Sequence, residues 1–133
     1  GDGMEKTCDL ARRDIKGLIF VNLVDFDSKY GHRNDADGYA KALSSFDSDL
    51  KKLDLLLGEG DAAIVTADHG CDPSDVSTDH TREYVPIVAF GRRLKSGVNL
   101  GVRESFCDIG ATVAQLLGLG LKTGKSFAEE IVL

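Results

Sequence analysis

The sequence predicts an α/β domain built around a largely parallel sheet. Its 133 residues are enough for one domain with a moderate core. Short apolar runs rich in branched residues, which suit strands covered on both faces, alternate with segments whose apolar residues recur at helical spacing. The predicted order is helix, strand, helix, strand, loop, strand, helix. In such an order, right-handed crossovers join parallel strands.

Three segments carry the helical pattern. The first covers residues 3–15 and places its apolar side chains on one stripe. The second covers residues 35–57, where apolar residues alternate in steps of four and three. The third covers residues 105–117 and is followed by glycines that end it. Residues 126–132 are a candidate for one more short helix.

Three runs are predicted to be strands, at residues 18–24, 62–67 and 84–90. The third has Pro86 near its start, where the missing amide donor is tolerated. Ligands of open α/β sheets gather beyond the carboxyl ends of the strands. Residues that follow the first two predicted strands are therefore candidates for a functional site.

Composition and charge argue against several classes of function. With 16 basic and 22 acidic residues, the formal net charge is −6 and no basic run occurs. This balance argues against nucleic acid and anionic membranes as partners. We find no apolar stretch of membrane-spanning length and no signal-peptide pattern. Three widely separated cysteines favour a reducing, cytoplasmic location. The opening Gly1-Asp2-Gly3-Met4 is typical of the interior of a longer protein.

Each of the three histidines lies near a carboxylate and after a predicted strand. His32 follows Asp27 by five residues, a spacing that suits a loop better than one face of an α-helix. His69 follows Asp68 directly, and His80 lies eleven residues further along the same polar loop. Imidazole nitrogens and carboxylate oxygens together suit zinc or manganese.

A solvated loop is the simpler explanation for any one of these pairs. Three histidines beside carboxylates at predicted strand ends favour a metal site instead. The candidate ligands are Asp27, His32, Asp68, His69 and His80. Five ligands exceed the usual four of a closed structural zinc site, so we predict two ions that share a phosphate between them.

Four hydroxyls near the candidate ligands are weaker candidates for a nucleophile: Thr66, Ser77, Thr78 and Thr81. Hydrogen bonds to the loop backbone explain these hydroxyls better. Cys71 is a candidate soft ligand, but a single thiol among carboxylates is more often packed or free. The run Thr123–Ser126, T-G-K-S, resembles the end of a phosphate loop, yet Leu119 stands where that motif requires glycine.

Three longer motifs surround the candidate ligands. They are V-D-F-D at 24–27 with Y-G-H-R at 30–33, T-A-D-H-G at 66–70, and T-D-H-T-R-E-Y-V-P at 78–86. In sequence and spacing these motifs resemble the phosphopentomutase family, which belongs to the alkaline phosphatase superfamily of two-metal phosphoryl-transfer enzymes. The resemblance covers essentially the whole chain.

The resemblance implies a fold and a place in a larger enzyme. The fold would be a partial three-layer α/β/α core with a mostly parallel sheet, as in alkaline phosphatase. Residues 1–133 would be the C-terminal part of the metal-binding phosphotransferase core. The family's cap domain and the N-terminal segment of its core would be absent.

The resemblance also implies how the ligands are shared. Asp27, His32 and His80 match the ligands of one manganese ion in this family, and Asp68 and His69 match ligands of the other. A phosphorylated threonine bridges the two ions in the family and belongs to a segment upstream of this chain. We therefore expect no catalytic nucleophile among these residues.

The implied reaction moves phosphate between the C1 and C5 hydroxyls of ribose or deoxyribose, with a sugar phosphate as substrate. We expect the chain alone to be inactive. Two other interpretations stay open. One is another superfamily enzyme, such as cofactor-independent phosphoglycerate mutase or a phosphohydrolase. The other is a non-catalytic metal-binding α/β module. The spacing from Asp27 to His32 and the run at 80–83 favour the pentomutase. The sequence makes no prediction of oligomeric state.

Overall fold

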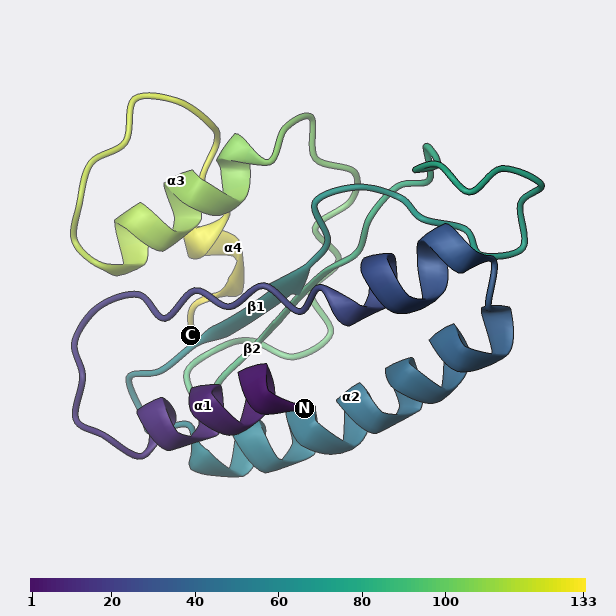
Figure 1. Ribbon diagram of the computed structural model, residues 1–133. Helices are drawn as coiled ribbons and strands as arrows, with labels where there is room; N and C mark the ends of the chain where they lie inside the picture. Colours follow the sequence, from purple (N-terminus) through teal and green to yellow (C-terminus); the bar gives the residue numbers. More distant parts are fainter.

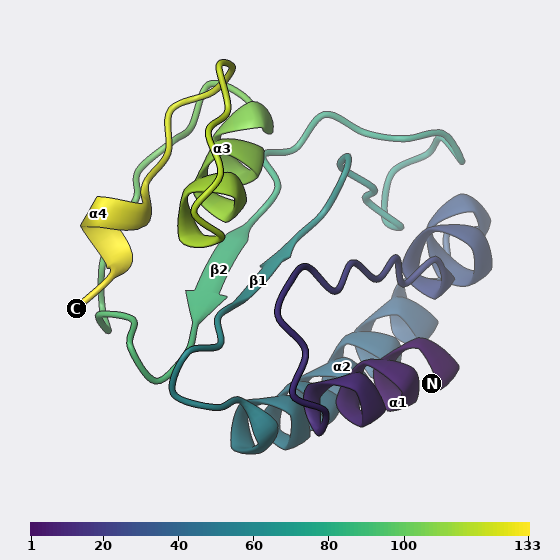
Figure 2. The same cartoon turned by 90° about the vertical axis from the view of Figure 1, so that its left-hand side faces the viewer.

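The computed structural model describes residues 1–133 and has helices on both sides of a two-stranded sheet. The α-helices are α1 (Asp2–Ala11), α2 (Ala36–Leu56), α3 (Cys107–Leu116) and α4 (Ala128–Ile131). The sheet consists of β1 (Ala63–Thr66) and β2 (Ile87–Phe90). In Figure 1 and Figure 2, α1 and α2 lie together on one side of the strands, and α3 and α4 lie on the other. The predicted α/β class is confirmed.

One core lies between α1 and α2, and both helices agree with the sequence pattern, although α1 is shorter than predicted. Asp35 caps α2 because its side chain accepts a 2.8 Å hydrogen bond from the amide of Gly38. Met4 and Cys8 of α1 pack with Leu53 of α2, and all three are buried.

No helix, α2 included, combines the length and the apolar character that a membrane span requires.

The strand predicted at residues 18–24 is wrong for this structure. Residues 16–23 make no backbone hydrogen bonds, although they run past β1 on the side of α1 and α2 (Figure 2). Val21 and Leu23 lie against Gly3 of α1. Phe20, between them and Ile19 in the alternation, is exposed to 84%. The alternation of side chains is that of a strand, but a strand needs a partner for its amides and carbonyls.

The sheet that forms is antiparallel, and no parallel pair is present among residues 1–133. Ala63 of β1 lies opposite Phe90 of β2. β1 agrees with the strand predicted at 62–67, and β2 occupies only the second half of the run predicted at 84–90. Pro86 explains the late start, because it offers no amide to a ladder and the pairing begins after it.

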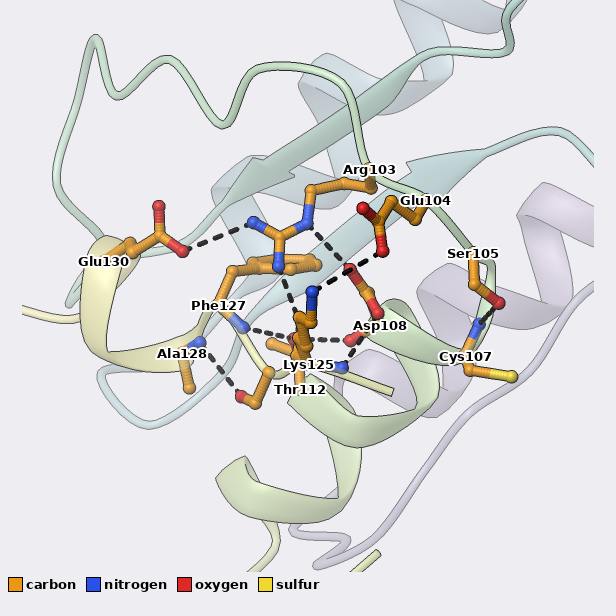
Figure 3. Close-up of polar contacts among 11 residues, drawn as sticks. Arg103, Glu104, Ser105, Cys107, Asp108, Thr112, Lys125, Phe127, Ala128 and Glu130 are labelled. Carbon is orange, nitrogen blue, oxygen red and sulfur yellow. Dashed lines mark hydrogen bonds and ion pairs between the residues drawn. The ribbon is translucent and has the colours of Figure 1, made fainter. Parts of the chain in front are cut away.

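A second cluster fastens the end of the chain to α3, as Figure 3 shows. Asp108 accepts hydrogen bonds from Arg103 Nε at 2.9 Å and from the amide of Lys125 at 2.8 Å. Thr112 Oγ1 accepts the amide of Phe127 at 2.9 Å, and both residues are fully buried. The guanidinium of Arg103 lies 5.3 Å from the centroid of the Phe127 ring. We call these five residues the C-terminal clamp.

The C-terminal clamp requires glycine at position 124. Gly124 has φ of +90°, and a Cβ there would overlap the carbonyl oxygen of Cys107 and lie 2.9 Å from the amide nitrogen of Asp108. The run Thr123–Ser126 is therefore packed against the start of α3, and the amide of Lys125 binds a carboxylate of the protein itself. This packing accounts for the T-G-K-S run without a phosphate loop.

The clamp predicts a pH dependence of stability. The hydrogen bond from the Lys125 amide, and then the bond and charge of Arg103, hold the pKa of Asp108 below its usual range. Because the folded pKa is depressed, this carboxylate stabilises the fold above its unfolded pKa of about 3.9, and the contribution is lost as pH falls through the lower folded value.

The free energy of unfolding, measured by urea titration, should fall more steeply with acidification for the wild type than for Asp108→Asn. The gap between the two proteins should thus be widest near neutral pH and narrow below about pH 4. Asp47→Asn, which changes an exposed residue paired only with Lys51, is the matched control. A gap that stays constant from pH 7 to pH 3 would contradict the assignment of Asp108.

Candidate metal centre

The first candidate ligands lie on two consecutive helical turns. A π-helix, η1, spans Phe26–Tyr30, and a 3₁₀ turn, η2, spans Gly31–Arg33. Asp27 lies on η1 and His32 on η2, so the expectation of a loop here is wrong. The π-helix connects residues i and i+5, and this wider turn suits a five-residue spacing. His32 Nε2 consequently lies 3.3 Å from Asp27 Oδ1.

Aromatic packing fixes η1 on α2. The Phe26 ring centroid lies 5.4 Å from that of Tyr39 and 5.9 Å from that of Phe46, the second pair edge to face. Asn34, which follows η2 with φ of +52°, donates from its side-chain amide to the carbonyl of Asp75 at 2.9 Å. The two turns are thus held by α2 on one side and by the polar loop after β1 on the other.

The second group of ligands lies on that polar loop, which is folded back on itself at its base. Gly70 and Thr81 form an isolated antiparallel bridge, in which the Thr81 amide donates to the Gly70 carbonyl at 3.1 Å. A Cβ at position 70 would lie 2.7 Å from the Thr81 carbonyl oxygen, so the bridge requires glycine. His69 and His80 each precede a residue of this bridge, and their rings stack at 3.6 Å between centroids.

The three candidate histidines lie around the Asp27 carboxylate. His32 Nε2 and His80 Nε2 each lie 3.3 Å from Asp27 Oδ1. Donor atoms of Asp27, His69 and His80 all lie within 4.8 Å of one another. Asp27 Oδ1 is buried and has no hydrogen-bond partner.

The other ring nitrogens of two histidines are held by backbone carbonyls. His32 Nδ1 lies against the Thr78 carbonyl oxygen at 2.5 Å, and His69 Nδ1 lies 3.1 Å from the Gly70 carbonyl oxygen. A carbonyl only accepts, so we assign a proton to Nδ1 in both rings, and Nε2 is then the nitrogen that can bind a metal. Metal-binding histidines are oriented by backbone carbonyls in this manner.

This donor set fits a divalent cation. The Nε2 atoms of His32 and His80 each lie 3.3 Å from a buried carboxylate oxygen that has no hydrogen-bond partner, and a positive charge among these atoms would stabilise the arrangement. Mixed nitrogen and oxygen donors of this kind suit zinc or manganese. Donor atoms of Asp27, His69 and His80 are close enough to share one ion, and His32 lies beside Asp27.

Asp68 is the candidate that lies apart. Its side chain is 79% exposed, and its Oδ1 is 3.5 Å from His69 Nε2. His69 stacks on His80 and reaches the Asp27 cluster as well as Asp68, so it lies between the two predicted ligand groups. Asp68 and His69 also line one end of a groove of about 1060 Å³ that continues past β2 to residues 94–106.

Two further side chains near the ligands have structural contacts. The Thr81 hydroxyl accepts the amide of Asp72 at 2.8 Å and donates to the Glu83 carboxylate, which agrees with the expectation that it bonds within the loop. Burial, and then the negative charge of Asp27, raise the pKa of the Cys71 thiol. All three cysteines of the chain are free.

Sequence reasoning missed the backbone part of this site. The carbonyls of Thr78 and Gly70 orient imidazoles, but a carbonyl is present at every residue and leaves no sequence signal. Gly31 and Gly70 do leave a sequence signal, because each is a glycine directly beside a candidate histidine. Both positions lack room for a Cβ, which is a reason for glycine that spacing alone does not reveal.

Comparison with known families agrees with a metal centre. The family model described as Metalloenzyme superfamily matches residues 1–121, which is most of the chain. The chain belongs to the metalloenzyme superfamily.

Within that superfamily, the chain is similar to phosphopentomutases. It is 54% identical over 130 residues to the phosphopentomutase of Carboxydothermus hydrogenoformans, covering 98% of this chain and 34% of that protein. It is 52% identical over 131 residues to the phosphopentomutase of Clostridioides difficile, with the same coverage. The chain spans about a third of the length of the curated relatives it matches. The predicted resemblance to this family is confirmed.

Proposed function

We propose that residues 1–133 form the C-terminal part of the metal-binding core of a phosphopentomutase. The complete enzyme would move phosphate between the C1 and C5 hydroxyls of ribose or deoxyribose through a phosphothreonine. The observation that carries this proposal is the gathering of three histidines around the Asp27 carboxylate, whose Oδ1 has no hydrogen-bond partner, in a chain about half identical to phosphopentomutases.

We propose two manganese ions as the cofactors. Asp27, His32 and His80 would hold one ion, and Asp68 and His69 would hold the other. The short distances around Asp27 Oδ1 support the first group, and the contact between Asp68 and His69 supports the second. When bound, such a pair polarises phosphoryl oxygens and favours an alkoxide nucleophile.

The groove beside Asp68 and His69 is the proposed place of the sugar phosphate. Arg82 also lines it, directly before Glu83 in the chain, and is a candidate to meet a phosphate group; the groove continues along β2. A formal net charge of −6 would otherwise repel an anionic substrate, so local positive charge at this end of the groove is needed.

The remaining parts of the enzyme are proposed to lie outside these 133 residues. They are the phosphothreonine, a further metal ligand, the cap domain and additional strands. Residues 18–23, which make no backbone hydrogen bonds and show strand-like alternation with exposed apolar side chains, support a mostly parallel sheet in a three-layer α/β/α core. Three free cysteines support a reducing, cytoplasmic setting.

The test compares this chain with the complete protein that contains it, each supplied with Mn²⁺. Conversion of ribose 1-phosphate to ribose 5-phosphate is expected for the complete protein and not for the 133-residue chain. Hydrogen exchange in the same two samples should show slow amides at residues 18–23 only in the complete protein. Complete protein that hydrolyses phosphate esters or isomerises phosphoglycerate, but leaves ribose 1-phosphate unchanged, would exclude the pentomutase.

A further inference from the structure

The two ligand-bearing segments touch at their base through a packing contact. Besides the two hydrogen bonds that join their outer parts, the side chain of Cys71 lies on the bare backbone of Gly31. Gly31 is buried, and a Cβ placed there would overlap the Cys71 sulfur and lie 3.6 Å from its Cβ. The thiol thus occupies the space that a side chain at position 31 would need.

This contact lies close to the ligands of both segments. Gly31 directly precedes His32, and Cys71 is two residues beyond His69. The bridge of Gly70 ties the backbone next to Cys71 to the base of the polar loop that carries His69 and His80. We expect a larger side chain at either position to move His32 away from His80. A smaller side chain at position 71 would let the two segments approach each other.

We propose that the contact between Cys71 and Gly31 is the spacer of the candidate metal centre, and that Cys71 is a positioning residue. The volume of its side chain sets the distance between the η1–η2 turns and the base of the polar loop, where His69 and His80 lie. A thiol packs like a small apolar group, and the glycine lets it approach the backbone. The consequence for metal binding rests on the proposed function, whereas the spacing is a property of the metal-free chain.

The test uses three variants of the chain: Gly31→Ala, Cys71→Ala and the double variant. The first readout is the NMR cross-relaxation between the rings of His32 and His80 in chelator, since their centroids are 4.9 Å apart. Gly31→Ala should lose this signal, and the double variant should regain it because the new methyl group occupies the space of the sulfur. Cys71→Ala alone should shift the imidazole resonances. Cys107→Ala, at an exposed cysteine, is the control.

The second readout is metal binding, by Mn²⁺ calorimetry and by the visible spectrum of bound Co²⁺. Gly31→Ala should weaken Mn²⁺ binding by about 10- to 100-fold, as expected for loss of ligand orientation. The double variant should return to within about threefold of the wild type, which is the signature of coupled neighbours. Circular dichroism shows whether each variant is folded.

Two outcomes overturn the spacer. One is a double variant that regains neither the ring contact nor the affinity lost by Gly31→Ala. The other is a folded Cys71→Ala chain whose imidazole resonances equal those of the wild type. If the wild-type chain binds neither Mn²⁺ nor Co²⁺, the proposed metal centre fails instead, and the ring contacts in chelator still decide the spacer.

Discussion

Asp27→Asn should reduce the affinity of the chain for Mn²⁺ by at least about 100-fold, because even residues that merely orient metal ligands cost up to about that factor. The substitution keeps the shape of the side chain and removes the one carboxylate on which His32 and His80 converge. Calorimetric titration measures the loss directly. Thermal unfolding gives a second measure, since a ligand at 100 times its Kd stabilises the native state by about 2.7 kcal/mol.

The metal-free proteins should respond in the opposite sense. The asparagine amide can donate to an imidazole Nε2, whereas Asp27 Oδ1 is buried without a hydrogen-bond partner, so Asp27→Asn should be at least as stable as the wild type in chelator. Asp25→Asn is the control, because it makes the same charge change at an exposed residue that pairs with Lys29. Equal losses of Mn²⁺ affinity in the two variants would contradict a specific role of Asp27.

Phe127→Ala should lower the free energy of unfolding by about 3–5 kcal/mol, the usual cost of removing a buried aromatic ring. The ring has no exposed surface, lies under the guanidinium of Arg103 and follows the run that packs on α3. Urea unfolding at neutral pH measures the loss. The Mn²⁺ affinity of the folded fraction should not change, because the C-terminal clamp contains none of the metal-ligand candidates.

Leu119→Ala is the comparison for Phe127→Ala. Leu119 lies in the turn after α3 and is 63% exposed, so its truncation should cost no more than about 0.5 kcal/mol. Similar losses in the two variants would mean that the clamp is not a core. A loss of Mn²⁺ affinity in Phe127→Ala alone would mean that the clamp supports the metal centre.

Local sequence signals predicted the helices well, and the sheet poorly. The capping aspartate and the regular apolar spacing of α2 are properties of a short stretch, and Asp35 and Leu53 lie as that spacing requires. A strand depends on a partner that can be far away in the sequence. The run at 18–24 has strand-like composition and alternation but no partner here, so composition alone could not predict its state.

The candidate site shows the same division between chemistry and geometry. Residue types and their positions after predicted strands were sufficient to select Asp27, His32, His69 and His80, which the structure brings together. The π-turn under Asp27 was not predicted, because a five-residue spacing on a helix matches no common helical period. The stacking of His69 on His80 depends on a bridge between two residues eleven positions apart.

The contact between the η1–η2 turns and the polar loop after β1 closes a long loop of the chain. Between Asp27 and His80 lie α2, β1 and the polar loop, about fifty residues whose ends meet through few direct bonds. A bound cation would act there as a reversible cross-link, comparable to a disulfide that forms and breaks with the supply of metal. Because closure entropy grows only slowly with length, one ion could secure this long loop at little more entropic cost than a short one.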